Sequence, residues 1–222
     1  MYIAQPEDTD MAIQEYIDQI KERRFFIDKE SRLLDIFISS LNTFNISKED
    51  VFYRGRILDE GKTEYTDSEL HAPPINLVGV GRLNPRRVRY LYVTDTAHTA
   101  AAELRPWISA VVVVGKAIPK RELKVLNFVP TEEEKNKEKS YRRQVSQMFS
   151  QPVRPNISDV EYLVTQSIAE YVKLKGFDGI RYQSAVDSKG VNYCLFDPES
   201  MNIENSHKLK INHIDYGISE AP

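Results

Sequence analysis

Residues 158–184 read SDVEYLVTQSIAEYVKLKGFDGIRYQS, and this stretch predicts a helix followed by a strand. Ser158 and Glu161 match the capping box that begins a helix, and Gly176 is a typical helix stop. The apolar residues between them recur at helical spacing and form one face: Val160, Leu163, Val164, Ile168, Tyr171 and Val172. Residues 177–182 then have strand composition and lead to Ser184, so the stretch predicts a helix packed against a β-sheet.

Further strands are predicted around this stretch. Apolar, β-branched and aromatic residues dominate four segments, at 88–93, 111–114, 123–128 and 192–196. The four valines at 111–114 are typical of a strand buried on both faces. The segment 192–196 follows a turn, so we expect it to pair with the strand before Ser184. Asp95 or Thr96 caps a short predicted helix through Ala102, whereas the polar tail beyond Pro198 predicts no element.

The N-terminal region has two amphipathic patterns. Apolar residues recur at helical spacing first at Ile13, Tyr16, Ile17 and Ile20, and then at Leu33, Leu34, Phe37, Ile38 and Leu41. Because only a short connection follows, we predict a helical N-terminal extension, residues 1–50, packed on a larger domain of residues 51–222. The charged stretch 131–143 is interpreted as a solvated helix or insertion, and an arm that contacts a partner is the alternative.

The composition is that of a soluble globular protein. The 222 residues are 41% hydrophobic and 28% charged, which suffices for one core with an appendage. The net charge of −3 gives no general attraction to nucleic acid or to an anionic membrane. No apolar run approaches the about 20 residues that span a bilayer, and the acidic start does not resemble a signal peptide. We therefore expect a cytoplasmic protein with no membrane or direct nucleic-acid partner.

The residues present disfavour several kinds of site. Cys194 is the only cysteine, and its apolar setting predicts a small buried side chain. The four histidines include no pair at the spacing of a helical zinc site, so we expect no metal. The sequence also has no glycine-rich loop of the kind that binds the phosphates of a dinucleotide cofactor or a nucleoside triphosphate.

Three polar residues stand at the edges of segments that otherwise look like core: Arg54, Glu103 and Ser184. Together with residues 81–84 (Gly-Arg-Leu-Asn) and 90–92 (Tyr-Leu-Tyr), their order resembles the RES family, which is named for its arginine, glutamate and serine. Members of that family cleave NAD and often act as toxins beside an antitoxin. The resemblance covers about residues 54–198.

The resemblance implies a fold and a set of partners. The family's α+β fold is similar to that of ADP-ribosyltransferase toxins, with a split mixed β-sheet and flanking helices around an NAD cleft. In this chain the helical N-terminal extension would precede it. NAD would be a substrate and no cofactor would be needed, with inorganic phosphate as a candidate co-substrate. The candidate protein partners are a helix-turn-helix antitoxin and a second copy of the chain, as a homodimer.

The resemblance and the chemistry of NAD together suggest roles for individual residues. Glu103 is the candidate main catalytic group, since a carboxylate stabilises the oxocarbenium-like sugar left when neutral nicotinamide departs. Arg54 and Arg82 are candidates for binding the diphosphate, with a surface ion pair as the alternative for either. Tyr92 would place its ring over the base; Tyr90 lies on the same strand face and could exchange roles with it, and a core tyrosine is the alternative.

Ser184 lacks the sequence context of a nucleophile, so we expect it to hydrogen-bond the substrate. With Glu103 and Arg54 it completes the candidate catalytic set. The leading hypothesis is an NAD glycohydrolase or NAD phosphorylase that cuts the nicotinamide-ribose bond, with water or phosphate as acceptor, and arrests growth as a toxin. The alternatives are an ADP-ribosyltransferase that modifies a protein or nucleic acid, and a non-catalytic module that binds a nucleotide or an antitoxin.

Overall fold

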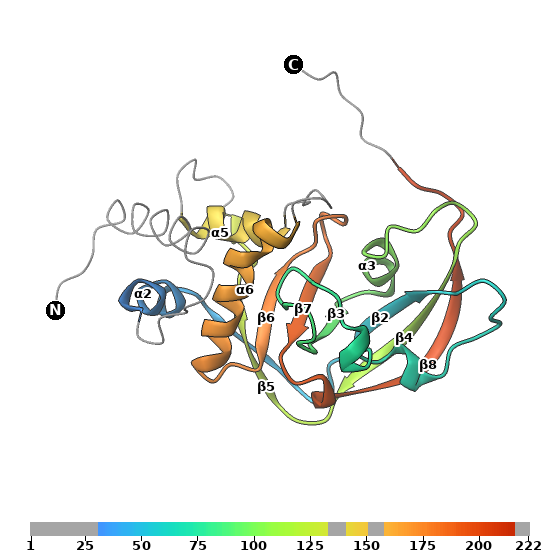
Figure 1. The fold of residues 1–222 in the computed structure, drawn as a ribbon, viewed down its shortest axis with the longest axis horizontal. Helices are drawn as coiled ribbons and strands as arrows, with labels where there is room; N and C mark the ends of the chain where they lie inside the picture. Colours follow the sequence, from blue (N-terminus) through green and yellow to red (C-terminus); the bar gives the residue numbers. More distant parts are fainter. Residues whose placement is uncertain (1–30, 133–140, 151–157, 216–222) are drawn as a thin grey trace, which may run out of the picture.

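The computed structural model describes residues 31–132, 141–150 and 158–215. Its centre is an eight-stranded sheet with the order β1-β5-β6-β7-β3-β2-β4-β8 (Figure 1). In this sheet β5 and β6 run parallel, and the other paired strands run antiparallel. The strands are β1 (Thr43–Ile46), β2 (Phe52–Ile57), β3 (Leu91–Thr94), β4 (Val111–Pro119), β5 (Leu123–Asn127), β6 (Gly179–Gln183), β7 (Val191–Leu195) and β8 (Met201–Lys210).

Helices flank both halves of this sheet. The helices α5 (Tyr141–Ser150) and α6 (Ser158–Leu174) lie beside β6, and α2 (Arg32–Ser40) packs against α6 (Figure 1). The short α3 (Ala97–Ala102) lies beside β2 (Figure 1). Short 3-10 helices complete the described elements: η1 (Asp67–Leu70), η2 (Ile75–Leu77) and η4 (Pro198–Ser200). The fold is therefore α+β with a mixed sheet, as expected.

Aromatic side chains attach the helices to the sheet. Phe37 of α2 packs on Phe128 with a ring-centroid distance of 5.8 Å, and Phe128 packs on Phe149 of α5 at 4.5 Å. All three are buried, and burying such a side chain contributes about 1.5–3 kcal/mol relative to leaving it exposed. Ile168 and Tyr171 of α6 extend the same core cluster.

The sheet splits between β2 and β3. Strand β2 pairs with β4 along its whole length, but its only paired residues with β3 are Tyr53 and Thr94. Arg54 bridges the gap: its Nη1 donates to the Tyr92 carbonyl at 2.9 Å, and its Nε donates to the Leu70 carbonyl at 2.5 Å. The guanidinium thus binds a backbone carbonyl that the diverging strand leaves unpaired.

The structure confirms the helix that begins at Ser158, and Gly176 ends it with a φ of 82°, which favours glycine. The short helix is α3, where the Thr96 side chain accepts a hydrogen bond from the Thr99 N–H at 3.0 Å. Strand β7 pairs with β6 as expected, and β3 begins three residues later than the predicted strand at 88–93. Cys194 is buried.

Two strands of the sheet were not predicted from the sequence. The tail beyond Pro198 contains β8, which pairs with β4 at the sheet edge; its largely exposed, polar residues hide it from a search for apolar strands. Residues 43–46, within the predicted helical extension, form β1 and pair with β5. The division of the chain at residue 50 stays a prediction.

The described residues include only part of the two N-terminal amphipathic patterns and of the charged stretch 131–143. The second amphipathic pattern is α2, whose N-cap is Ser31. The first, at residues 13–20, lies outside the described residues, as do residues 133–140 of the charged stretch. Among the helices of the described ranges, none combines the length and the apolar character that crossing a membrane requires.

Candidate functional site

Glu103 and Ser184, two of the residues singled out from the sequence, are in direct contact. Glu103 is the C-cap of α3, and Ser184 follows β6. The Ser184 hydroxyl donates to Glu103 Oε1 at 2.7 Å, and Asn192 Nδ2 donates to the same oxygen at 2.6 Å. Ser184 and Asn192 are buried, at 5% and 6% exposure, so two shielded donors hold the carboxylate in one orientation.

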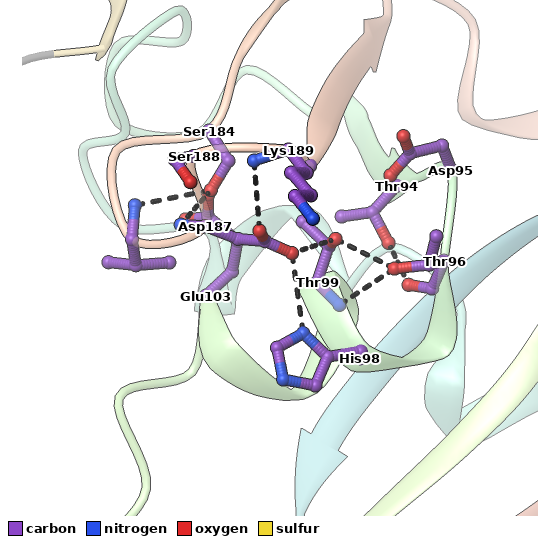
Figure 2. Close-up of polar contacts among 12 residues, drawn as sticks. Thr94, Asp95, Thr96, His98, Thr99, Glu103, Ser184, Asp187, Ser188 and Lys189 are labelled. Carbon is purple, nitrogen blue, oxygen red and sulfur yellow. Dashed lines mark hydrogen bonds and ion pairs between the residues drawn. The ribbon is translucent and has the colours of Figure 1, made fainter. Parts of the chain in front are cut away.

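A second contact joins the same two segments of the chain. Asp187, in the loop between β6 and β7, accepts hydrogen bonds from Thr99 Oγ1 at 2.7 Å and from His98 Nδ1 at 3.3 Å, both in α3 (Figure 2). The Asp187 N–H in turn donates to Ser184 Oγ at 3.0 Å. Because the Glu103 N–H bonds the Thr99 carbonyl at 2.9 Å, Thr99, Glu103, Ser184 and Asp187 form a closed ring of hydrogen bonds.

The hydrogen bonds that the Asp187 carboxylate accepts lower its pKa. Burial alone would raise that pKa, but the hydrogen bonds from Thr99, the Lys189 N–H and His98 together outweigh it. Close packing supports the same arrangement: a Cβ on Gly190 would lie 2.4 Å from Thr99 Oγ1, so only glycine lets the loop approach α3 this closely. The carboxylate of Asp187 is therefore ionised and fixed against the helix that carries Glu103.

Arg54 and Tyr92 belong to a neighbouring cavity. Its volume is about 210 Å³, and its lining residues are Arg54, Pro73, Val78, Gly79, Val80, Gly81, Asn84, Tyr90 and Tyr92. Burial lowers the pKa of Arg54 to about 10, which still leaves the guanidinium charged at neutral pH. Since two of its nitrogens bind backbone carbonyls, Arg54 has a structural role in addition to any role towards a ligand.

Both tyrosines of the predicted strand line this cavity, so the structure does not select one over the other. The Tyr92 hydroxyl donates to Asn84 Oδ1 at 2.7 Å and accepts from the Leu83 N–H at 3.3 Å. Burial raises the pKa of Tyr92 well above its usual value, so the phenol stays protonated. Tyr90 packs on Phe196 with a centroid distance of 5.0 Å and has its pKa raised by burial.

Arg82 lies in the loop of residues 81–84, which α6 holds in place. Thr165 Oγ1 donates to the Arg82 carbonyl at 2.6 Å, and Gln166 Nε2 donates to the Gly81 carbonyl at 2.8 Å. The Arg82 guanidinium donates to the Met148 carbonyl at 2.8 Å and lies 5.5 Å from the centre of the Tyr162 ring. Arg54, the other candidate cation, forms no ion pair with a described residue, and its guanidinium binds the backbone carbonyls of Leu70 and Tyr92.

The strand register relates the two groups of residues. Tyr92 pairs with Cys194 and Thr94 pairs with Asn192, so Tyr92 and Asn192 lie on one face of adjacent strands, two positions apart. Glu103 and Ser184 do not line the 210 Å³ cavity, but Asn192 connects them to the strand beside Tyr92. Tyr92, Glu103 and Ser184 therefore approach the same face of the sheet, from β3, α3 and the end of β6.

Comparison with protein-family models gives a match to the RES domain over residues 55–217. This chain belongs to the RES domain family. Arg82, Glu103 and Ser184 lie inside the matched range, and Arg54 immediately precedes it. Among solved structures, the chain is similar to one in the crystal structure of the M. tuberculosis MbcT-MbcA toxin-antitoxin complex, with 14% identity, a TM-score of 0.44, and coverage of 81% of this chain and 92% of that chain. A comparison with curated proteins found no match.

Three residues of this RES-domain site were missed by the sequence reasoning: Thr99, Asp187 and Asn192. Asn192 had a usable signal, because an amide inside a strand whose five residues are all buried requires a partner there. Its Oδ1 is enclosed without a hydrogen-bond partner among the described residues. Thr99 and Asp187 had no such signal, since turn and helix positions commonly carry these residue types.

Proposed function

We propose that this protein degrades NAD by cleaving the bond between nicotinamide and ribose. The observation that carries the proposal is the Glu103 carboxylate, whose Oε1 is held by buried donors from Ser184 and Asn192. Its Oε2 has no hydrogen-bond partner among the described residues. That oxygen is available to accept a hydrogen bond from a ribose hydroxyl.

The chemistry requires little beyond such a carboxylate. Nicotinamide leaves as a neutral molecule when its bond to ribose breaks, so no side chain has to protonate it. The sugar becomes oxocarbenium-like, and a carboxylate fixed beside it stabilises the developing positive charge. The donors on Oε1 contribute by keeping the carboxylate in place before the substrate arrives, which avoids reorganisation during the reaction.

The remaining candidate residues fit the other parts of NAD. Arg54 and Arg82 carry positive charge towards which the diphosphate would be drawn, and a guanidinium can bind two phosphate oxygens at once. The exposed part of the Tyr92 ring offers an apolar surface for a base, while its hydroxyl is already used by Asn84 and Leu83. Ser184 acts on the substrate through Glu103 in this proposal, because its hydroxyl hydrogen is donated to that carboxylate.

Incubation with NAD tests the proposal directly. Purified protein is incubated with NAD, with and without inorganic phosphate, and the products are identified by mass spectrometry with Glu103→Gln as the control. We expect nicotinamide with ADP-ribose, or with ADP-ribose 1''-phosphate if phosphate is the acceptor. If ADP-ribose is instead found attached to a macromolecule, the activity is that of an ADP-ribosyltransferase. Unchanged NAD would contradict the proposal.

We further propose that the protein acts as a toxin controlled by an antitoxin, as family membership suggests. Expression without a partner should deplete cellular NAD and stop growth, and Glu103→Gln should relieve both effects together. Growth arrest with an intact NAD pool would show that the toxic reaction is a different one.

A further inference from the structure

Arg87 adopts a backbone conformation that a residue with a side chain rarely takes. Its φ is 67°, in a turn that is closed by a 3.2 Å hydrogen bond from the Val88 N–H to the Pro85 carbonyl. Glycine and asparagine are favoured where a turn requires a positive φ, because most side chains cost energy there. An arginine at this position is therefore strained, and strained residues that persist in a fold cluster at functional sites.

The strained turn lies against the wall of the 210 Å³ cavity. The Arg87 N–H donates to the Val78 carbonyl at 3.2 Å. The Asn84 amide donates to the carbonyls of Gly79 at 3.0 Å and of Pro85 at 3.1 Å, so it ties both ends of the loop together. Val78, Gly79 and Asn84 all line the cavity. The backbone of Arg87 is therefore one hydrogen bond away from the cavity lining.

The cations of this turn have no carboxylate beside them in the described part of the chain. Arg86 and Arg87 are exposed, and neither side chain forms a hydrogen bond or an ion pair with a described residue. Arg89 differs, because its guanidinium lies 3.5 Å from Glu199 and also donates to two backbone carbonyls. The two guanidinium groups of the turn are therefore available to an anionic ligand.

The cavity beside the turn carries charge of one sign. Arg54 is the charged residue in its lining, and no described aspartate or glutamate lines it. Lys173, in the last turn of α6, adds a second cation, with its Nζ 5.3 Å from the centre of the Tyr90 ring. The charge of Glu170 also acts on Tyr90, but the cations of the lining, the helix and the turn outnumber it. The cavity and its rim therefore favour an anion.

We propose that Arg87, assisted by Arg86, attracts the diphosphate of NAD to this cavity. The inference rests on the proposed function, because it names the part of that substrate on which the turn acts. The hydrogen bond to Val78 fixes the place from which the charge acts. A guanidinium without an internal partner breaks no protein hydrogen bond when a phosphate approaches, and it can bind two phosphate oxygens. Arg87 thus acts in capture of the substrate and not in the chemical step.

Steady-state kinetics with NAD at two salt concentrations test the proposal. At about 10 mM salt, Arg87→Gln should raise KM about fourfold, which corresponds to the attraction between one charge and a doubly charged diphosphate about 10 Å away in water. The kcat should stay unchanged, because a charge that acts equally on bound substrate and transition state affects KM alone. Near 1 M salt the difference should disappear, since the Debye length falls to about 3 Å. Arg87→Lys should keep the low KM.

Two further variants separate the charge from the backbone strain and from charge in general. Arg87→Gly removes the charge and the strain together, so KM should rise as in Arg87→Gln while the melting temperature increases by about 1–4 °C. Lys48→Gln is the charge control. Lys48 is exposed between β1 and β2, and β1 lies four strands away from β3 in the sheet order, so its KM should equal that of the unmodified protein.

Equal KM values for the unmodified protein and Arg87→Gln at low salt would overturn the inference. A difference that persists at 1 M salt would also overturn it, since such a difference does not arise from attraction between charges. Should Arg87→Gln not fold, Arg87→Gly supplies the same comparison without the strain. If the unmodified protein consumed no NAD, the proposed function would fail instead, so the two failures are distinguishable.

Discussion

The Ser184 hydroxyl donates a 2.7 Å hydrogen bond to the Glu103 carboxylate, although 81 positions separate the two residues in the sequence. The contact depends on two segments that approach from different sides. α3 brings Glu103 from beside β2, and β6 brings Ser184 from the half of the sheet that α5 and α6 cover (Figure 1). Asp187 and Thr99 join these segments a second time, which fixes the distance between them.

Glu103→Gln should abolish turnover of NAD while leaving the fold and the affinity for ADP-ribose intact. The amide has nearly the same size, but it lacks the negative charge that stabilises the oxocarbenium-like sugar. We expect kcat to fall by at least about a hundredfold, as for loss of one preorganised electrostatic group. Initial rates of NAD consumption and binding of ADP-ribose measure the two effects. Near-normal turnover by the folded variant would exclude Glu103 as the main catalytic group.

Thr99→Val should weaken the ring without altering the residues proposed to touch the substrate. Valine matches threonine in shape but cannot donate to Asp187, so a partly buried hydrogen bond to a charged group is lost. Such a bond contributes about 1.5–3 kcal/mol to the free energy of unfolding. We also expect kcat to fall by about tenfold, the equivalent of about 1.4 kcal/mol in the barrier, because Glu103 and Ser184 are held less firmly.

Thr99→Ser is the matched control, since it retains the hydroxyl and should keep most of the activity. A double variant tests the coupling: when Ser184→Ala is present, Thr99→Val should reduce kcat much less than it does alone. Additive effects of the two substitutions would show that the ring does not couple them.

Two substitutions of Asn192 test whether its hydrogen bond to Glu103 contributes to kcat. Asn192→Leu removes the donor to Glu103, and we expect kcat to fall by about 10- to 100-fold, the equivalent of one hydrogen bond to a charged group. Asn192→Asp places a second carboxyl group against Glu103, and two adjacent carboxylates retain a shared proton to a higher pH than either alone.

While the carboxyl group introduced by Asn192→Asp is protonated, it can still donate to Glu103, so this variant should be active at acid pH and lose activity as the pH rises. The unmodified protein should not show this loss in the same range. Equal pH profiles of kcat for the unmodified protein and Asn192→Asp would contradict the assigned contact.

Much of the fold was predictable because local patterns agree with the tertiary structure. The helix from Ser158 carries its own start, stop and apolar face, and the valines of β4 are buried on both faces. β8 carries no such signal: as a polar edge strand it is specified by its pairing with β4, a contact that does not appear in a local pattern. β1 was missed for a similar reason, since it follows α2 within a segment dominated by helical spacing.

The site was predictable to a different degree. Glu103 and Ser184 were found as polar residues at the edges of core segments, and they do meet in space. The double attachment of Arg54 to Leu70 and Tyr92 could not be foreseen, because it depends on where β2 and β3 diverge. Asp187 and Thr99 contact each other only because a loop and a helix distant in sequence pack together.

Arg54→Ala should therefore affect both stability and binding, and not binding alone. Removing the guanidinium leaves the carbonyls of Leu70 and Tyr92 without these partners, and an unsatisfied buried group costs about 1–3 kcal/mol. We expect a lower melting temperature together with a weaker affinity for ADP-ribose. Arg56→Ala is the control, since Arg56 is exposed and pairs with Asp59 at the surface. Unchanged stability of Arg54→Ala would contradict the bridging role.

The contact between α2 and α6 should depend on pH through Asp35. Its carboxylate is bound by Lys175 at 2.6 Å and by the Tyr171 hydroxyl at 2.8 Å, and the hydrogen bond from Lys175 is the largest cause that lowers the Asp35 pKa. A lowered pKa means that the folded state favours the ionised form, so this stabilisation is present above the ordinary Asp pKa and is lost as the pH falls through the folded value.

Between about pH 6 and about pH 3, the melting temperature of the unmodified protein should therefore fall more steeply than that of Asp35→Asn, which has no carboxylate to protonate. The difference between the two proteins should be small, because Asp35 and Lys175 are partly exposed and water screens their attraction. It should also shrink as salt is added, whereas the contribution of Phe37 to the same interface should persist. Parallel melting curves at every pH would show that the ion pair does not help to attach α2 to the rest of the protein.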